Sequence, residues 1–278
     1  MPGIYTIRIK DAKLNSKYYL AKKFKPNKSR VREGDISNFK HYCDPEGITF
    51  SVEGNTVTLT KAIVGPSKTI EFEGRDTGGQ FIRLAVTFLM NLEEGRKHEI
   101  ETIELPKFIP EPGPKKKNGK AIMLMVQMIK MTLRENEKAE FRFGDKLNTD
   151  ARSSEDMPQL FDLLRDVFGI NFTMEEYEED CFLVERHADT PSKELGVLKI
   201  DNHLCDEIIF TAIVLWSQGK EIPCIEMETP VSWDYHIEAM IKFGRGVGMK
   251  IEDSKPLEGV KEWVKAGGVR KIKILNEK

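Results

Sequence analysis

The stretch DTGGQFIRLAVTFLMN, residues 76–91, organises the rest of the chain because similar stretches occur twice more. Two glycines open it, and apolar residues then fall on nearly every face of a predicted helix. A helix that is apolar all round has to be buried. Its counterparts are KAIMLMVQMIKMTLR, residues 120–134, and HLCDEIIFTAIVLWS, residues 203–217. A short polar break follows each stretch, and then a strand-like run at residues 98–103, 139–143 and 222–228, which indicates three copies of one unit.

A second recurring pattern consists of an amphipathic helix followed by short strands. We expect its helices at residues 35–43, 156–168 and 233–243. The strands that follow are expected at residues 48–52 and 56–60 around a turn at Gly54 and Asn55, at 170–172 and 181–185, and at 249–252. The acidic residues 175–180 (EEYEED) are expected at the solvated tip of the second hairpin. A strand at 4–9, with Tyr5, Ile7 and Ile9 on one face, a helix at 257–266 and a strand at 269–275 complete the expected elements.

The order of the two patterns predicts the fold class. The N-terminal part has the second pattern without an apolar helix before it, and residues 76–103 have an apolar helix and strand without the second pattern after them. These halves complement each other. We therefore predict an α/β protein with one domain, residues 1–278, of three βαβαββ repeats, its buried helices inside the sheets as in an inside-out α/β barrel. The repeats comprise residues 29–60 with 64–104, then 113–188, then 195–252, and residues 253–278 add the last helix and strand.

Composition limits the classes of function. The chain has 278 residues, 40% hydrophobic and 32% charged, as expected for a soluble globular protein. The formal net charge of −2 argues against binding nucleic acid or a membrane through charge alone. The four cysteines have neither CxxC spacing nor the density of a disulfide framework, so we expect reduced thiols, no metal and no cofactor. No signal sequence or membrane-spanning stretch is apparent, and the expected location is the cytoplasm.

Glu33 and Asp35 stand where the first amphipathic helix is expected to begin. In a closed cleft that raises one pKa, such a pair could act as general acid and base. Carboxylates at the start of a helix also cap its N–H groups and balance its dipole without any catalytic role. The sequence leaves both interpretations open.

Lysines and glycines precede the second apolar helix in the stretch PGPKKKNGK, residues 112–120. Positive side chains, small residues and free N–H groups at a helix N-terminus would make an entrance for a phosphate group, with Lys115, Lys116 and Lys120 as its ligands. The alternative is a solvated lysine-rich loop. Residues 77–80 form a second, weaker candidate for an anion site. His203 or His236 could act as a proton shuttle or nucleophile, although core or surface roles are more common.

Several of these stretches resemble the superfamily of enolpyruvate transferases and RNA 3′-terminal phosphate cyclases, and most closely the 5-enolpyruvylshikimate-3-phosphate synthases. Residues 31–59 resemble a synthase stretch that begins VKESDRI, and residues 112–124 resemble the motif PGSKSxSxRALLL. Residues 231–252, VSWDYHIEAMIKFGRGVGMKIE, resemble VSxPYxxxTxxxMxxFGVxxE. GGQFIR and HLCDE are similar to the GGGQxxR and HLxDQ runs of the cyclases.

The resemblance implies a lobe of three repeats, whereas the synthases close two such lobes on phosphoshikimate and phosphoenolpyruvate. It implies catalytic roles for Glu33 and Asp35, and substrate or phosphate contacts for Arg32, Gln80, Arg83, Lys115, Lys116 and Lys120. The chain departs from the pattern at three places. Ile36 replaces an arginine that helps to hold the enolpyruvate carboxylate, and a second motif arginine aligns nearest Gln80, with Arg83 one turn away. Cys205 and Asp206 fall near a serine pair that contacts the shikimate phosphate. Without a guanidinium, bidentate recognition of a carboxylate is lost.

Two main functions follow from this resemblance. The first is a carboxyvinyl transferase of the shikimate-pathway type, which binds a phosphorylated small molecule in a cleft completed by a homo-oligomer or a second-lobe subunit. The second is a non-catalytic binding or interaction module of the same fold, which the missing arginine favours. RNA 3′-phosphate cyclase-like activity is a weaker third option. The sequence does not decide whether the chain is an enzyme.

Overall fold

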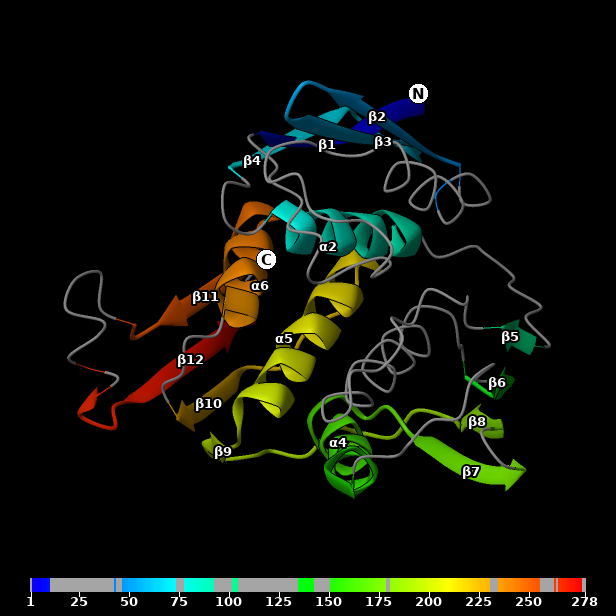
Figure 1. Cartoon of the computed structure of the whole chain (residues 1–278), viewed down its shortest axis with the longest axis vertical. Coiled ribbons are helices and arrows are strands. Elements are labelled where there is room, and N and C mark those ends of the chain that lie inside the picture. The colour runs from blue at the N-terminus through cyan, green and yellow to red at the C-terminus, as the bar shows by residue number, and fades with distance from the viewer. Residues whose placement is uncertain are drawn as a thin grey trace, which may run out of the picture. The chain divides into compact units, whose positions relative to one another are not determined.

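The computed structural model describes residues 2–10, 43, 47–73, 78–92, 102–104, 135–142, 151–178, 181–230, 235–255, 263 and 265–276 (Figure 1). The chain divides into two compact units. Unit 1 comprises Met1–Tyr19, Phe24–Glu94 and Gly196–Lys278, and unit 2 comprises Leu20–Lys23 and Gly95–Leu195.

The described strands form three four-stranded sheets. Sheet A has the order β2 (Ile48–Glu53), β3 (Thr56–Val64), β1 (Pro2–Lys10) and β4 (Lys68–Glu73). Sheet C has the order β11 (Lys250–Asp253), β12 (Val269–Leu275), β10 (Ile225–Pro230) and β9 (Leu198–Lys199). Sheet B, in unit 2, has the order β5 (Thr102–Glu104), β6 (Glu137–Arg142), β8 (Cys181–Arg186) and β7 (Phe172–Glu178).

The three sheets share one pairing scheme. Each has a single parallel pair at one edge, β1 with β4, β5 with β6 and β9 with β10, and its other strands are antiparallel. In sheets B and C the edge strand of the parallel pair comes first in the chain, as β5 before β6 and β9 before β10. In sheet A the edge strand comes last, because β4 pairs with the N-terminal β1 and is followed by α2 (Gly78–Asn91). The chain is mixed α/β, as predicted, and its described residues form open sheets rather than a closed barrel.

Three helices lie between sheets A and C of unit 1 (Figure 1). On one side α2 packs on β1, β2 and β3, and on the other it packs on α5 (Asn202–Ser217) and α6 (Tyr235–Gly246). Helix α5 contacts β10, and α6 contacts β4 and β11. The prediction that the apolar stretches at 76–91 and 203–217 form buried helices is confirmed, since Phe81, Leu84, Leu89, Ile209 and Ile213 are at most 1% exposed.

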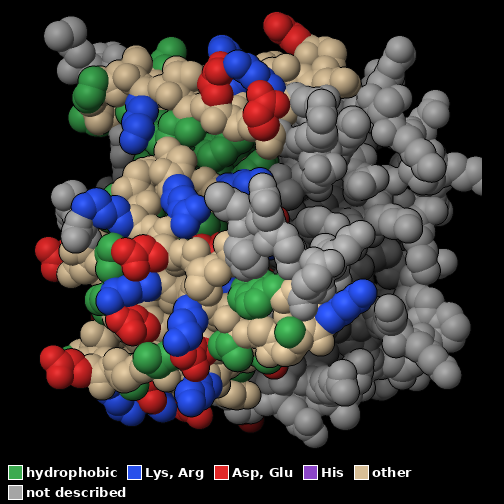
Figure 2. All heavy atoms as spheres, turned by 90° about the vertical axis from the view of Figure 1, so that its left-hand side faces the viewer, with side chains coloured by type: hydrophobic (Ala, Val, Ile, Leu, Met, Phe, Trp, Pro, Cys, Tyr) green, Lys and Arg blue, Asp and Glu red, His purple; other side chains and the backbone are tan. Residues whose placement is uncertain are grey.

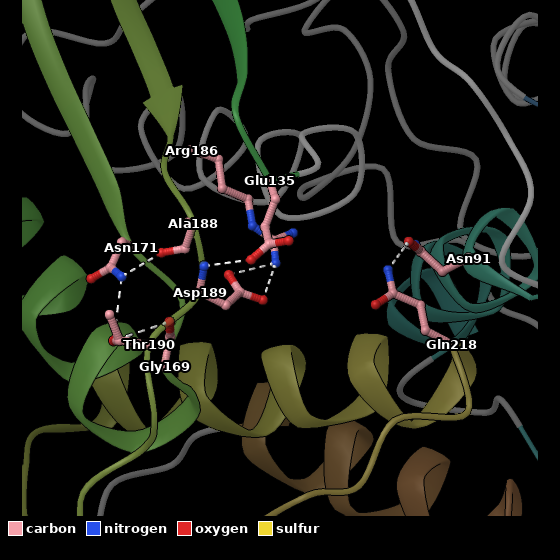
Figure 3. A network of polar contacts seen from close by, with 9 residues as sticks. All are labelled: Asn91, Glu135, Gly169, Asn171, Arg186, Ala188, Asp189, Thr190 and Gln218. Atoms are coloured by element: carbon pink, nitrogen blue, oxygen red, sulfur yellow. Dashed lines mark hydrogen bonds and ion pairs between the residues drawn. The ribbon is translucent and has the colours of Figure 1, made fainter.

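Aromatic stacking around Phe72 joins β4 of sheet A to helices α2 and α6. Its ring stacks on Phe81 of α2 at 5.0 Å and on Phe243 of α6 at 5.1 Å between ring centroids. A Cβ on Gly246 would lie 2.4 Å from the Phe72 ring, so only glycine allows α6 to approach β4 this closely. At the other end of α2, Asn91 accepts a hydrogen bond of 3.1 Å from Gln218, the residue that caps α5 (Figure 3).

Unit 2 packs α4 (Ala151–Phe168) against β7, with Phe161 and Phe172 at 5.7 Å between ring centroids. Helix α4 ends at Phe168, as predicted, and the Gly169 that follows has a φ of 74°, which favours glycine. The following segment returns to the same glycine, because the backbone N–H of Thr190 donates to the Gly169 carbonyl at 2.8 Å.

Several expectations need correction. Most of the acidic stretch EEYEED is strand rather than a hairpin tip, since β7 continues through Glu178. Pairing with β8 compensates for the low strand propensity of these acidic residues. Strand β4 was not expected. Helix α4 begins earlier than residue 156, and β10 begins at Ile225 rather than 222. The strand at 269–275 is confirmed as β12, but it is an inner strand of sheet C rather than an addition to it. The helices expected at 35–43, 120–134 and 257–266 lie wholly or mostly outside the described residues.

Candidate functional site

Most residues that the sequence nominates for chemistry lie outside the described part of the chain. These are Arg32, Glu33, Asp35, Lys115, Lys116 and Lys120. Gln80 and Arg83 belong to the first half of α2, whose backbone is described without these side chains. Their roles therefore stay predictions.

His203 and His236 both stand in the first turn of a helix. Helix α5 starts directly after the short parallel strand β9, and α6 starts after its partner β10. Both helices thus begin at the carboxyl ends of the parallel pair, the edge at which α/β folds commonly bind ligands. The two histidine side chains are not among those described, so their functions stay predictions.

Polar side chains gather at this edge on the inner face of sheet C. Alternation along β12 places Arg270 on the same face as Ile272 and Ile274, and all three are buried. Arg270 donates from Nε to Asp253 Oδ1 at 2.9 Å and from Nη2 to Asp253 Oδ2 at 2.7 Å. Only 5% of the arginine side chain and 12% of the aspartate side chain are exposed. This two-pronged geometry holds both planar groups in a fixed orientation.

Three further elements add to this group. The backbone N–H of Lys255 donates to Asp253 Oδ1 at 3.1 Å, and its ammonium contacts the Glu238 carboxylate of α6. Thr229 of β10, the strand partner of Arg270, donates its hydroxyl to Asn202 of α5 at 2.8 Å. We call Asn202, Thr229, Glu238, Asp253, Lys255 and Arg270 the carboxyl-edge cluster.

The carboxyl-edge cluster is balanced in charge, with two cations and two carboxylates. Burial, and after it the positive charge of Arg270, lowers the pKa of Lys255, although the nearby Glu238 carboxylate favours the charged amine. Each of these contacts joins groups that satisfy one another. The cluster therefore fixes the start of α6 to the ends of β11 and β12, and any ligand would have to bind beside this framework.

A second polar group lies on the inner face of sheet A. Two rows of side chains across the sheet are apolar: Phe50, Leu59, Ile7 and Ile70, and Val52, Val57, Ile9 and Phe72. The next row consists of Ile48, Lys61, Tyr5 and Lys68. We call Lys61, Tyr5 and Lys68 the lysine–tyrosine row.

Each member of the lysine–tyrosine row has a distinct environment. Lys61 is 9% exposed, and its ammonium donates to the carbonyls of Leu89 and Leu92 at the C-terminal end of α2, where a cation is favoured by the helix dipole. Tyr5 is 5% exposed and packs on Phe88 at 5.5 Å between ring centroids. Burial raises its pKa to about 12. The ammonium of exposed Lys68 lies 5.7 Å from the centroid of the Tyr5 ring.

In unit 2, a polar network fixes the chain that follows β8 (Figure 3). Buried Arg186 donates from Nη2 to both carboxylate oxygens of Asp189, at 3.0 and 2.9 Å. The backbone N–H of Asp189 donates to Glu135 Oε1 at 2.6 Å. Asn171 adds a bond of 2.8 Å to the Ala188 carbonyl. Because these bonds tie the segment after β8 to the residues just before β6 and β7, we interpret the network as structural.

Helix α5 also buries two neighbouring carboxylates, Asp206 and Glu207, which are 2% and 3% exposed, beside fully buried Cys205. Cys205 and Asp206 are the residues that fall near the position of the synthases' serine pair in the sequence resemblance. Both side chains lie in the interior of unit 1.

Among the described residues, no three His, Cys, Asp or Glu side chains gather closely enough to hold a metal ion. None of the helices in the described ranges combines the length and apolar character needed to cross a membrane. On the side shown in Figure 2, the described acidic and basic side chains are interspersed rather than gathered by sign. Two pairs of this kind, Lys273 with Glu226 and Lys271 with Glu228, join β12 to β10 at 2.5 and 3.2 Å.

Comparison with known proteins gives little. No protein-family model matches the chain, and no curated protein matches it. Among solved structures, the EPSP synthase from Acinetobacter baumannii aligns with 90% of this chain at 10% identity and a TM-score of 0.26. The alignment covers 41% of the synthase, so the chain spans less than half of its length. At this identity and TM-score, the similarity assigns neither a family nor an activity.

Proposed function

We propose that the chain is a single lobe of the enolpyruvyl-transferase type, which binds a phosphorylated small molecule in a cleft completed by a second lobe or subunit. The lobe would be one domain of three βαβαββ repeats with its apolar helices inside, cut by the chain ends within one repeat. The observation that supports it most is the pairing scheme shared by sheets A, B and C, with β1 beside β4. The resemblance of residues 31–59, 112–124 and 231–252 to synthase motifs supports it independently.

In this proposal, phosphate binds at the start of the second apolar stretch. Lys115, Lys116 and Lys120 supply the charge, and the glycines of PGPKKKNGK leave backbone N–H groups accessible. Arg32, Gln80 and Arg83 are the further substrate ligands that the resemblance implies. Glu33 and Asp35 would exchange the proton that carboxyvinyl transfer requires. Water has to be excluded during this step, which is why a partner lobe is part of the proposal.

A turnover assay tests the catalytic form of the proposal. Purified chain is incubated with phosphoshikimate and phosphoenolpyruvate, and released phosphate is followed for monomeric and assembled fractions separately. We expect turnover in the assembled fraction, abolished in Glu33→Gln and Asp35→Asn and retained in Lys271→Gln, a matched change on the exposed face of β12. If neither fraction releases phosphate, the chain is not this enzyme.

The second candidate is a non-catalytic binding module of the same fold. Two observations favour it: Ile36 stands in place of a carboxylate-binding arginine, and Cys205 and Asp206 are buried in α5. A module of this kind would bind phosphoshikimate or another sugar phosphate without turnover. Thermal unfolding with and without these compounds distinguishes the two, because a specific ligand raises Tm by mass action whether or not it reacts.

A further inference from the structure

One member of the lysine–tyrosine row, Tyr5, carries a buried hydroxyl that lacks an acceptor among the described residues. Among the described residues, the Tyr5 hydroxyl has no hydrogen-bond partner, although Tyr5 is only 5% exposed. Buried polar groups are nearly always satisfied, so an exception requires an explanation. Neither sheet neighbour provides one, because the Lys61 ammonium is itself a donor and points to the Leu89 and Leu92 carbonyls.

Lys68 lies on the other side of Tyr5, at the first position of β4. Among the described residues, its ammonium contacts the Tyr5 ring and pairs with no carboxylate. The acidic residue of β4, Glu71, belongs to the opposite face of the sheet, where it pairs with Arg8 and Lys10. The row at this point of the inner face, Ile48, Lys61, Tyr5 and Lys68, therefore contains two lysines and no carboxylate.

We propose that Lys68 and the Tyr5 hydroxyl form a binding site for a small oxyanion, the phosphate or carboxylate group of a small molecule. An oxyanion offers several acceptor lone pairs, so a single group could accept from both the phenol and the ammonium. Lys68 is exposed at the first position of β4, so its ammonium can meet a ligand that approaches Tyr5 from solvent.

The raised pKa of Tyr5 agrees with this role, since the phenol stays protonated and can donate throughout the neutral range. The site lies within sheet A and does not use the residues of PGPKKKNGK. It therefore goes beyond the proposed function and can be tested separately from it.

The test measures Tm with increasing inorganic phosphate, and with acetate in parallel, against chloride at matched ionic strength. The proteins are the wild type, Tyr5→Phe, Lys68→Gln and the double variant Lys115→Gln/Lys120→Gln. Tyr5→Phe keeps the ring and removes only the orphan hydroxyl, so the variant should fold. Ultraviolet difference spectra of wild type and Tyr5→Phe report directly on the phenol.

We expect a saturable rise in Tm of the wild type with phosphate, acetate or both, and the two arms identify which group is preferred. The rise is lost in Tyr5→Phe and Lys68→Gln and kept in the double lysine variant, and it is accompanied by a tyrosine difference spectrum that Tyr5→Phe lacks. Equal rises in wild type, Tyr5→Phe and Lys68→Gln would overturn this site. If those three proteins show equal rises in Tm and only the double lysine variant shows none, the proposed phosphate site at PGPKKKNGK stands and the Lys68–Tyr5 site is wrong. Absence of any rise in the wild type also overturns the inference.

Discussion

Arg270 and Asp253 form a two-pronged ion pair at 2.9 and 2.7 Å, at one end of the buried inner face of sheet C. They come from strands β12 and β11, which are antiparallel neighbours in sheet C. Ser254 and Lys271 join the same strand ends with mutual bonds of 2.9 and 2.8 Å. The pair therefore fixes the ends of the two strands to each other and closes one end of the core of unit 1.

Removing one partner of this pair should be strongly destabilising. Asp253→Asn leaves the buried guanidinium without a counter-charge, and we expect the free energy of unfolding to fall by about 3–5 kcal/mol. The control is Glu228→Gln, because its partner Lys271 is 69% exposed and such surface pairs contribute about 0–1 kcal/mol. Urea unfolding of both variants checks the prediction, and equal losses would show that the buried pair has no special weight.

Gly169→Ala should cost more than a positive φ alone explains. A Cβ at this position would lie 1.8 Å from the Thr190 carbonyl oxygen, which the chain cannot accommodate without moving the segment after β8. Gly219 has the same φ of 74° with no atom within 4 Å of a Cβ, so Gly219→Ala measures the backbone penalty alone, about 1 kcal/mol. We expect Gly169→Ala to exceed it by at least about 1 kcal/mol. Indistinguishable unfolding midpoints would contradict the close approach.

Lys61→Met should destabilise unit 1 although it replaces a charge with an apolar side chain of similar length. The ammonium satisfies carbonyls at the end of α2, and without it those groups lose a buried donor. We expect a loss of about 1–2 kcal/mol in the free energy of unfolding. The control is Lys250→Met, because Lys250 is exposed. A neutral or stabilising effect of Lys61→Met would contradict the prediction and would mean that water satisfies the Leu89 and Leu92 carbonyls in the variant.

Tyr5 makes stability depend on alkaline pH. Its folded pKa of about 12 lies above the ordinary value of 10.0, so the unfolded chain loses this proton first. The contribution of the protonated phenol is complete below pH 10 and is lost as pH rises through 12. Wild type should therefore lose stability faster than Tyr5→Phe as pH rises above about 10. Parallel free energies of unfolding for the two proteins across that range would be inconsistent with a buried phenol.

Much of the fold could be predicted from periodicity. The helices at 76–91 and 203–217 are apolar on most faces, which only burial explains, and the strand at 4–9 alternates with Tyr5, Ile7 and Ile9 inward, as observed. Strand β4 was not predicted because its sequence, KTIEFE, has only two apolar residues and follows a turn. Its strand character comes from pairing with β1, some 60 residues earlier, which no local pattern encodes.

The polar groups of unit 1 could be predicted only in part. Alternation in VRKIKIL places Arg270 inward with Ile272, and alternation in TVTLTKAIV places Lys61 inward with Leu59, so an inward charge was visible in both strands. Their partners were not visible. The pairing of Arg270 with Asp253, and the position of Tyr5 between Lys61 and Lys68, follow from register between strands that are distant in sequence.

Calorimetric titration of the chain with phosphoshikimate, alone and with phosphoenolpyruvate, tests the central claim most directly. The proposed lobe predicts saturable binding that weakens at least about tenfold in Lys120→Gln, the loss expected when a charge-assisted contact worth about 1.4 kcal/mol is removed, and that is unchanged in Lys271→Gln. Absence of binding heat with either compound, or equal binding by wild type and Lys120→Gln, would contradict the account.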